Sequence, residues 1–208
     1  MDEQIGLRER KKRRMYKDVS DIAVRLFLEK GFDAVSVAEV AAAAGISKPT
    51  LFRYFPAKED LVLHRIADHE DEAARVVTGA ASPLGALRRH FLDGLGQCDP
   101  ITGLNDHPEV LAFHRLLYGT PALVARMHEY LRRSEAALAG ALGGDLDARL
   151  AAGQIVAVRR ILAEDNWRRI AAGERVDEVR ADAMAAAERA FGLLEAGLPW
   201  LGEATGNN

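Results

Sequence analysis

Cationic, hydroxyl and aromatic side chains gather in the short segment between residues 47 and 58. Lys48, Arg53 and Lys58 carry positive charges, and Thr50 and Tyr54 carry hydroxyl groups. All of these groups donate hydrogen bonds to phosphate oxygens, and a guanidinium can also bond the N7 and O6 atoms of guanine together. The segment therefore suits non-covalent binding of a nucleic acid better than covalent chemistry.

Two short helical patterns on either side of Gly45 must position these side chains. The first pattern begins at Ser36, and Glu39 stands three residues later, at the spacing of a capping box. Apolar residues then recur at helical intervals as far as Ala44, and Gly45 follows where a helix can end with a positive φ. We therefore predict a helix of about two turns with Ser36 as its N-cap.

The second pattern starts at Ser47 or Lys48, and Pro49 lies in its first turn, where the missing N–H costs nothing. Leu51 and Phe55 are four residues apart and form the buried side of this helix. A proline directly after Phe55 ends the pattern. The donor-rich side chains are therefore predicted to point outward.

A third helix upstream must complete the core, since two helices this short are marginal on their own in water. Val19, Ala23 and Phe27 recur at helical spacing, and Gly31 ends that pattern. Phe32 is expected to fold back onto the same core. An ordinary three-helix corner of an all-α protein would show the same pattern, but the donor-rich outer side of the second helix favours a helix-turn-helix that binds DNA.

The run from Leu26 to Leu61, LFLEKGFDAVSVAEVAAAAGISKPTLFRYFPAKEDL, resembles the N-terminal DNA-binding domain of the TetR family of bacterial transcriptional regulators. Five features agree in order: Leu-Phe before Glu-x-Gly-Phe, the capped helix, the Ala-Gly turn, the Leu-x-x-x-Phe helix and the Lys-Glu-Asp-Leu restart. The resemblance implies an all-helical homodimer that usually represses transcription. It also implies release of the operator when a small molecule enters the C-terminal domain.

The resemblance further implies roles for single residues. Thr50 and Tyr54 are expected to donate to phosphates, and Lys58 is expected to reach a phosphate from the start of the next helix. Lys48 and Arg53 then remain to contact base edges. Arg53 is the sharper candidate, because a guanidinium bound to guanine is worth ~1–3 kcal/mol of discrimination between bases.

Phe52 departs from the family pattern, in which many members carry a tyrosine at this position. Its ring is expected to pack on a sugar or on a thymine methyl group. The full set of candidate DNA-binding residues is Ser36, Ser47, Lys48, Pro49, Thr50, Phe52, Arg53, Tyr54 and Lys58.

A basic segment, RERKKRRMYK at residues 8–17, precedes the helix-turn-helix pattern and holds seven basic residues and one acid. It fits a solvated tail or an arm that neutralises phosphates or enters the adjacent minor groove. A membrane-binding basic helix is a third alternative, although residues 8–14 lack the apolar bulk that it needs. The end of the segment also fits an extension of the first helix, because Met15 lies four residues before Val19.

Length, composition and charge support a division into parts. With 208 residues, 49% of them apolar, the chain has room for one small and one medium globular domain. Residues 1–65 carry a net charge of +3 from 13 basic and 10 acidic residues, whereas the remaining 15 basic and 21 acidic residues give −6. We predict a basic arm at 1–17, a DNA-binding domain at 18–60, a connecting helix at 61–80 and a ligand-binding and dimerisation domain at 81–208.

Beyond residue 80 the chain alternates breaks and helical patterns, with no repeat and no strand-like alternation. Residues 94–108 form a long irregular connection in this interpretation. Helices are predicted from about residue 83 and at about 109–118, 121–142, 145–172 and 177–196. The predicted fold is all-α with about nine helices, a three-helix DNA-binding domain followed by a larger helical domain.

The last two predicted helices are long and rich in alanine, and their small residues would allow helix axes to approach closely. The resemblance implies that they form a four-helix bundle between the two chains of a homodimer; the alternative is that they cover the core of their own chain. A dimer is also expected because one short recognition helix makes few base contacts, and a palindromic operator doubles them.

Several aromatic and sulfur-containing side chains of the larger domain are candidates for an effector site. They are Phe91, Phe113, His114, Tyr118, Met127, Tyr130 and Trp167. Such residues at helical spacing also serve as core packing, so both interpretations stay open. The segments HPEVLAFHRLL, 157–167 and FGLLEAGL resemble actinobacterial family members that respond to fatty acyl-coenzyme A, which implies a small apolar or amphipathic effector.

Other functional classes lack their motifs. The histidine spacings match no metal motif, so no metal or cofactor is expected. Without G-x-S-x-G, a P-loop or paired carboxylates, an enzyme is not expected; a helical interaction module that does not read DNA remains the alternative. No long apolar run or signal-peptide pattern is present, so we expect a soluble, cytoplasmic chain without membrane partners. Cys98 stands alone and is either a chance thiol or a sensor of oxidants.

Overall fold

The computed structural model describes residues 7–67 and 69–202, and every regular element in these two ranges is a helix. Ten α-helices and two short 3-10 helices occupy the ranges, so the all-α fold class is confirmed. The sequence predicts about nine helices. The additional helix arises because the connecting segment forms two short helices, α4 (Asp60–Ala67) and α5 (Glu72–Val77).

Within the described ranges, no helix is both long and apolar enough to cross a lipid bilayer. The other helices follow in chain order. They are α1 (Leu7–Lys30), α2 (Val37–Ala43), α3 (Lys48–Tyr54), α6 (Pro83–Gly96), η1 (Pro100–Thr102), α7 (Pro108–Gly119), α8 (Pro121–Ala141), α9 (Leu146–Ala171), α10 (Val176–Gly197) and η2 (Pro199–Leu201).

The chain divides into two compact units. The first combines the chain up to residue 68 with Ala112–His128, and the second combines residues 69–111 with the chain from Glu129 onward. Helices α7 and α8 therefore each contribute residues to both units. The boundaries at residues 17, 60 and 80 that the sequence suggests stay predictions.

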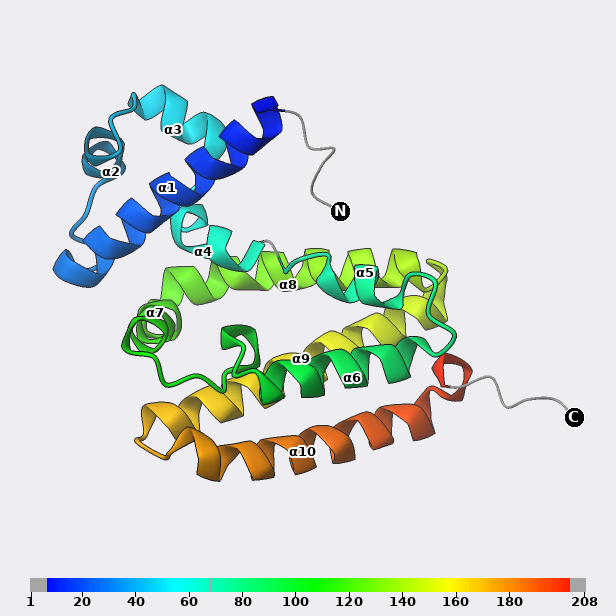
Figure 1. Ribbon diagram of the computed structural model, residues 1–208. Helices are drawn as coiled ribbons and strands as arrows, with labels where there is room; N and C mark the ends of the chain where they lie inside the picture. The colour runs from blue at the N-terminus through cyan, green and yellow to red at the C-terminus, as the bar shows by residue number, and fades with distance from the viewer. Residues whose placement is uncertain (1–6, 68, 203–208) are drawn as a thin grey trace, which may run out of the picture. The chain divides into compact units, whose positions relative to one another are not determined.

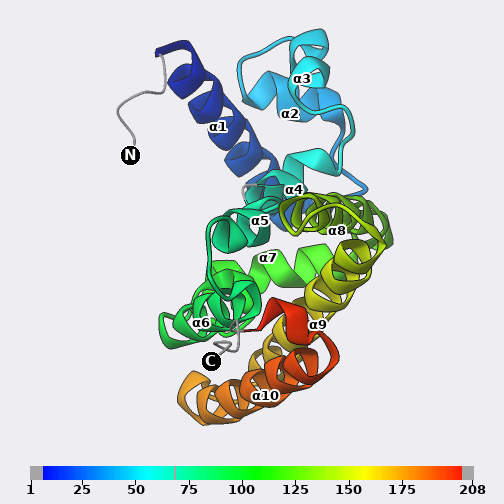
Figure 2. The same cartoon turned by 90° about the vertical axis from the view of Figure 1, so that its right-hand side faces the viewer.

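The helix-turn-helix lies in the first unit, where α2 and α3 lie together beside α1 (Figure 2). The predicted capping box is present: the Ser36 hydroxyl accepts from the Glu39 N–H at 3.1 Å, and the Glu39 carboxylate accepts from the Ser36 N–H at 3.2 Å. Gly45 has a φ of +66° in the turn, a conformation that glycine adopts without strain. Ser47 caps α3 by accepting from the Thr50 N–H at 3.2 Å.

A small apolar core holds these helices together. The rings of Phe27 and Phe32 lie 5.0 Å apart, which confirms that Phe32 folds back onto the core. Leu51 and Phe55, the predicted inner residues of the second helix, are almost fully buried. Because α1 packs against both α2 and α4, α3 is presented on a compact support.

The basic segment at residues 8–17 lies on α1, which begins at Leu7 and is 24 residues long. Lys17 pairs with Asp21 one turn later at 2.6 Å. An exposed pair of this kind contributes only about 0.3–0.5 kcal/mol. Because α1 begins at Leu7, residues 8–17 are helical. Residues 1–6 of the predicted arm lie outside the described residues.

In the second unit, α10 packs along both α6 and α9, and α5 packs on α6 (Figure 1). The rings of Phe91 on α6 and Phe191 on α10 lie 6.2 Å apart and are nearly or fully buried. These helices enclose the larger apolar core of the chain.

The segment at residues 94–108 is more ordered than the sequence suggests, because η1 packs directly on α9. A Cβ atom added at Gly103 would lie 1.9 Å from the carbonyl oxygen of Ala163. The buried Asn166 side chain donates to the Thr102 carbonyl at 2.9 Å. The glycine and the amide together allow the connection to cover this helix.

Cys98 lies between α6 and η1 with a φ of +53°. Its Sγ accepts from the Arg180 guanidinium at 3.0 Å, and its carbonyl accepts from the Asn105 side chain at 2.7 Å. The cysteine thus takes part in the packing of this connection against α10.

Candidate DNA-binding interface

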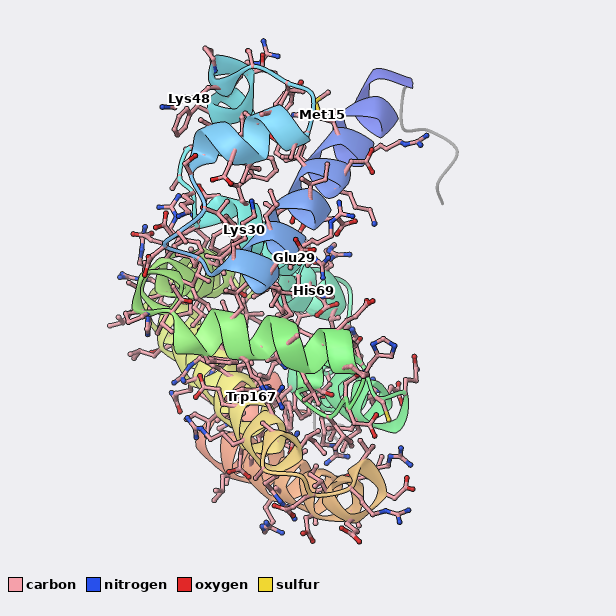
Figure 3. All side chains as sticks on the ribbon, turned by 90° about the vertical axis from the view of Figure 1, so that its left-hand side faces the viewer. Met15, Glu29, Lys30, Lys48, His69 and Trp167 are labelled. Atoms are coloured by element: carbon pink, nitrogen blue, oxygen red, sulfur yellow. The ribbon has the colours of Figure 1, made fainter. Side chains whose placement is uncertain are left out.

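The outer side of α3 carries four of the candidate side chains that the sequence indicates. Leu51 is 1% exposed and faces the core, whereas Lys48, Pro49, Phe52 and Arg53 are exposed. Figure 3 shows Lys48 at the outer edge of the first unit. The arrangement leaves cationic and flat side chains available to a partner on one side of a single short helix.

Two serines fix where the helices of this interface begin. Ser47 accepts from the Thr50 N–H and also shares a hydrogen bond between hydroxyl oxygens with Thr50, 2.8 Å apart. Glu39, which caps α2 with Ser36, accepts from Lys30 at 3.0 Å. Hydrogen bonds from Lys30 and from the Ser36 backbone lower the pKa of the Glu39 carboxyl. Both serine hydroxyls are therefore engaged as caps.

The cations of α3 lie beside aromatic rings. Lys48 Nζ is 5.8 Å from the centre of the Phe52 ring, and the Arg53 guanidinium is 5.2 Å from the centre of the Tyr54 ring. Phe52 is 40% exposed, so its ring and Lys48 lie together at the surface of α3. The rings can hold the two cations in a preferred orientation and leave them exposed to solvent.

Tyr16 of α1 supports the end of α3, a role that the sequence analysis missed. Its ring makes edge contacts with Tyr54 and Phe55 and stacks on His64, each at 5.1 Å between ring centres. In the sequence, the position of Tyr16 three residues before Val19 indicates that its ring lies on the inner side of α1. The contact places the Tyr54 ring beside α1 and connects the recognition helix to the basic part of that helix.

Lys58 is the candidate most engaged within the chain. Its Nζ donates to the Phe32 carbonyl and lies 4.4 Å from the centre of the Phe32 ring and 5.5 Å from that of Phe27. The side chain is half-buried. Contact with a phosphate would require Lys58 to exchange or share these partners.

Some of the effector-site candidates meet in the first unit. On α7 the ring of Phe113 lies 6.0 Å from that of His114, and His114 lies 6.1 Å from Tyr118. Burial lowers the pKa of His114 to about 4, so the ring is neutral at physiological pH. Met127 of α8 is also buried in this unit.

The remaining candidates, Phe91, Tyr130 and Trp167, belong to the second unit. Phe91 is a core residue that packs on Phe191. The Tyr130 ring lies 4.2 Å from the Arg133 guanidinium, and Trp167 lies on α9 (Figure 3). These three side chains come from three different helices, and their common use in an effector site stays a prediction.

A half-buried charged cluster surrounds Glu72 in the second unit, and the sequence alone does not predict it. Its carboxylate lies 3.1 Å from His69, 3.5 Å from Arg159 and 3.8 Å from His90. Burial alone would raise the pKa of Glu72, but the hydrogen bond from His69 and the charges of His69, Arg159 and His90 outweigh it and lower the pKa. Glu72 thereby ties α5 to α6 and α9.

Comparison with known proteins agrees with this geometry. Residues 20–64 match the family described as bacterial regulatory proteins, tetR family. The HTH-type transcriptional regulator TcmR of Streptomyces glaucescens is 35% identical over 135 residues, which span 62% of this chain and 58% of TcmR. The match therefore covers less than two thirds of the relative's own length.

Solved structures share the fold along most of the chain. NalD, the secondary repressor of the MexAB-OprM multidrug efflux pump in Pseudomonas aeruginosa, has a TM-score of 0.55 at 17% identity, covering 88% of this chain and 96% of NalD. The SmeT–triclosan complex has a TM-score of 0.56 at 15% identity, covering 88% and 90%. At these identities the likeness shows the fold alone.

The family match falls on the residues that form the helix-turn-helix, and the family consists of regulators and not of enzymes. The chain therefore carries a helix-turn-helix domain of the TetR type at residues 20–64, within an all-helical fold that it shares with solved structures such as NalD.

Proposed function

We propose that this chain is a ligand-responsive repressor that binds a palindromic operator as a homodimer and is released by a small effector. The observation that carries the proposal is the exposed, donor-rich side of α3, whose other side is anchored by Leu51 and Phe55. A helix held in this way fits the major groove, where its side chains reach base edges and phosphates. The descriptions of TcmR as a transcriptional regulator and of NalD as a repressor support the proposal.

Within this proposal, Thr50, Tyr54 and Lys58 hold the domain on phosphates. Such contacts fix the position of a protein on the duplex but carry no sequence information. Ser36 and Ser47 cap the starts of α2 and α3, where the backbone N–H groups of a helix favour a negatively charged partner.

Arg53 and Lys48 are the side chains that we assign to base edges, because both are exposed on α3. Phe52 and Pro49 supply apolar surface between them, which suits a sugar or a thymine methyl group. The basic part of α1 adds charge that can neutralise further phosphates and steepen the dependence of affinity on salt.

Exposed apolar side chains on the last two helices support a dimer through α9 and α10. Leu146, Leu150 and Ile161 are exposed on α9, and their spacing places them on one side of that helix. Leu193 on α10 is 77% exposed. Apolar side chains gathered on two helices are typical of an interface between chains.

We assign the effector to the class of small apolar or amphipathic molecules, and fatty acyl-coenzyme A is the first candidate to test. The assignment rests on the sequence resemblance and on the largely buried ring of His114, which lies beside the rings of Phe113 and Tyr118. The SmeT complex with triclosan is an example of a small molecule held by this fold. Thermal stabilisation of the chain by acyl-coenzyme A but not by planar drugs would support it, and the reverse pattern would exclude it.

The experiment that tests the proposed function is a footprint on the DNA beside the chain's own gene. The purified chain should protect two half-sites separated by about one helical turn or a multiple of it. A Lys48→Ala/Arg53→Ala variant is the control and should leave this DNA unprotected. If the wild-type chain protects no site at micromolar concentration, the alternative of an interaction module that does not read DNA gains support.

The same footprint decides the direction of regulation, because an operator that overlaps a promoter blocks transcription whereas one upstream permits activation. A reporter gene under this promoter should be silenced when the chain is produced. The proposal places this activity in the cytoplasm, where a bacterial operator is accessible.

A further inference from the structure

Asp60, the first residue of α4, is a carboxylate that is only 5% exposed. It accepts from the Ala57 N–H at 3.0 Å and from the Arg126 guanidinium through Nε at 2.8 Å and Nη2 at 3.0 Å. Two parallel bonds between a guanidinium and a carboxylate form the strongest and most directional ion-pair geometry. Arg126 lies on α8, 66 residues away in sequence and outside residues 20–64 that match the family's DNA-binding domain.

The carboxylate of Asp60 secures the connection between the recognition helix and α4. This connection begins where α3 ends, three residues before Ala57. Asp60 holds the Ala57 N–H, and Lys58 between them donates to the Phe32 carbonyl. Because Arg126 fixes the orientation of this carboxylate, it acts on the end of α3 through Asp60.

Helix α8 belongs to both compact units, since its residues up to His128 group with the DNA-binding helices and those from Glu129 onward with the second unit. Seven residues after Arg126, Arg133 donates from Nε to both carboxylate oxygens of Glu70 at 2.9 Å, within the second unit. Residues seven apart lie on the same side of a helix. One side of α8 therefore carries an arginine–carboxylate pair in each unit.

We propose that Arg126 is a positioning residue for DNA binding and that its pair with Asp60 couples α8 to the recognition helix. The inference rests on the proposed function and adds a route for its regulation. An effector that shifts α8 in the second unit moves Arg126, because a helix transmits displacement along its length. Coupling between two sites is reciprocal, so DNA bound to α3 must also stabilise the arrangement of α8 around Arg126.

The first test measures operator affinity for Arg126→Met, which keeps most of the aliphatic stem and removes the guanidinium. We expect binding to weaken on the order of tenfold, within the usual range of coupling between sites, with the preferred sequence unchanged. The matched control is Arg132→Met on the same helix, where an exposed arginine pairs only one turn away with Glu129 at 2.9 Å. It should bind within about twofold of the wild type, as expected for an exposed pair.

Asp60→Asn tests whether the Asp60 carboxylate couples Arg126 to α3. The amide oxygen of asparagine still accepts from the Ala57 N–H but carries no charge. Added to Arg126→Met, it removes a buried charge that has lost its guanidinium and should restore most of the affinity. Arg126→Lys keeps the charge without the two-pronged geometry and should lie between the wild type and Arg126→Met. Thermal unfolding of each variant establishes that it is folded under the binding conditions.

Hydrogen exchange separates coupling from simple stabilisation. Operator DNA should slow amide exchange in the part of α8 around Arg126 in the wild type and leave it unchanged in Arg126→Met. The inference is wrong if Arg126→Met binds the operator as tightly as the wild type, or if DNA still slows exchange in α8 of this variant. Failure of the wild type to bind any operator would instead overturn the proposed function, and this inference with it.

Discussion

Lys58 and Thr50 already hydrogen-bond within the chain, whereas Lys48 and Arg53 extend into solvent beside aromatic rings. Contacts to phosphates would therefore exchange one set of polar partners for another, and the net gain of each exchange is modest. Contacts from the exposed cations replace water and leave the hydrogen bonds within the chain in place. At the scale of single residues, we therefore expect Lys58 and Thr50 to contribute to affinity for any DNA, and Lys48 and Arg53 to set the sequence preference.

Arg53→Ala and Lys58→Ala should accordingly behave differently on DNA. Loss of Arg53 should relax the preference at one base pair of each half-site by about 1–3 kcal/mol, whereas loss of Lys58 should weaken all sequences alike and reduce the salt slope by about one. Selection from random DNA and binding at several salt concentrations measure the two effects. An unchanged operator preference in Arg53→Ala would show that this arginine contacts no base.

His114 makes the stability of the fold dependent on pH. The unfolded chain takes up a proton at this residue near pH 6.5, whereas burial lowers the pKa in the folded chain to about 4. Stability is therefore full above pH 6.5 and falls as the pH drops towards 4, by on the order of 2 kcal/mol for a partly exposed ring. Urea unfolding of His114→Gln between pH 7 and 4 should show a flatter profile, and His107→Gln at an exposed position should match the wild type.

At the scale of elements, local chemistry in the sequence predicts more than distant contacts do. The capping box of Ser36 and Glu39 and the turn at Gly45 could be predicted, because each depends on residues within one helical turn. The pair between Arg126 and Asp60 could not, since helical periodicity carries no information about residues 66 positions apart. For the same reason, the position of Tyr16 three residues before Val19 predicts a ring on the inner side of α1 but not its contact with Tyr54.

At Gly103, the contact between η1 and α9 leaves no room for a side chain. Gly103→Ala would place a methyl group 1.9 Å from the Ala163 carbonyl oxygen on a backbone with φ of +74°. Separation of η1 from α9 should cost several kcal/mol, on the order of 3. The control is Gly140→Ala in the last part of α8, where an added Cβ atom would meet no packing neighbour within 4 Å. This change should stabilise the fold by about 0.5–1 kcal/mol. Equal unfolding midpoints for the two variants would contradict the close packing at η1.

At the scale of the whole molecule, one recognition helix of seven residues offers few base contacts. Two copies joined through α9 and α10 would combine two weak half-site contacts into one strong one. The exposed apolar residues of these helices are where the proposed dimer is most sensitive to charge.

Leu193→Lys should therefore convert the dimer to single chains of 22.7 kDa, because an ammonium group would be buried in an apolar interface. Operator affinity should fall on the order of a hundredfold as avidity is lost. Sedimentation and DNA titration measure both effects, and Leu28→Lys on α1, 42% exposed, is the matched control for the mass in solution. A Leu193→Lys variant that stays dimeric would place the interface elsewhere.

The membership of Ala112–His128 in the first unit limits how this protein can be recombined with its relatives. A hybrid that joins residues 1–67 of this chain to the body of another regulator would keep Asp60 but lose Arg126. Such hybrids should repress well only if the new body supplies an arginine at the equivalent position of α8. In this protein, the natural module for exchange is therefore not one continuous stretch of sequence.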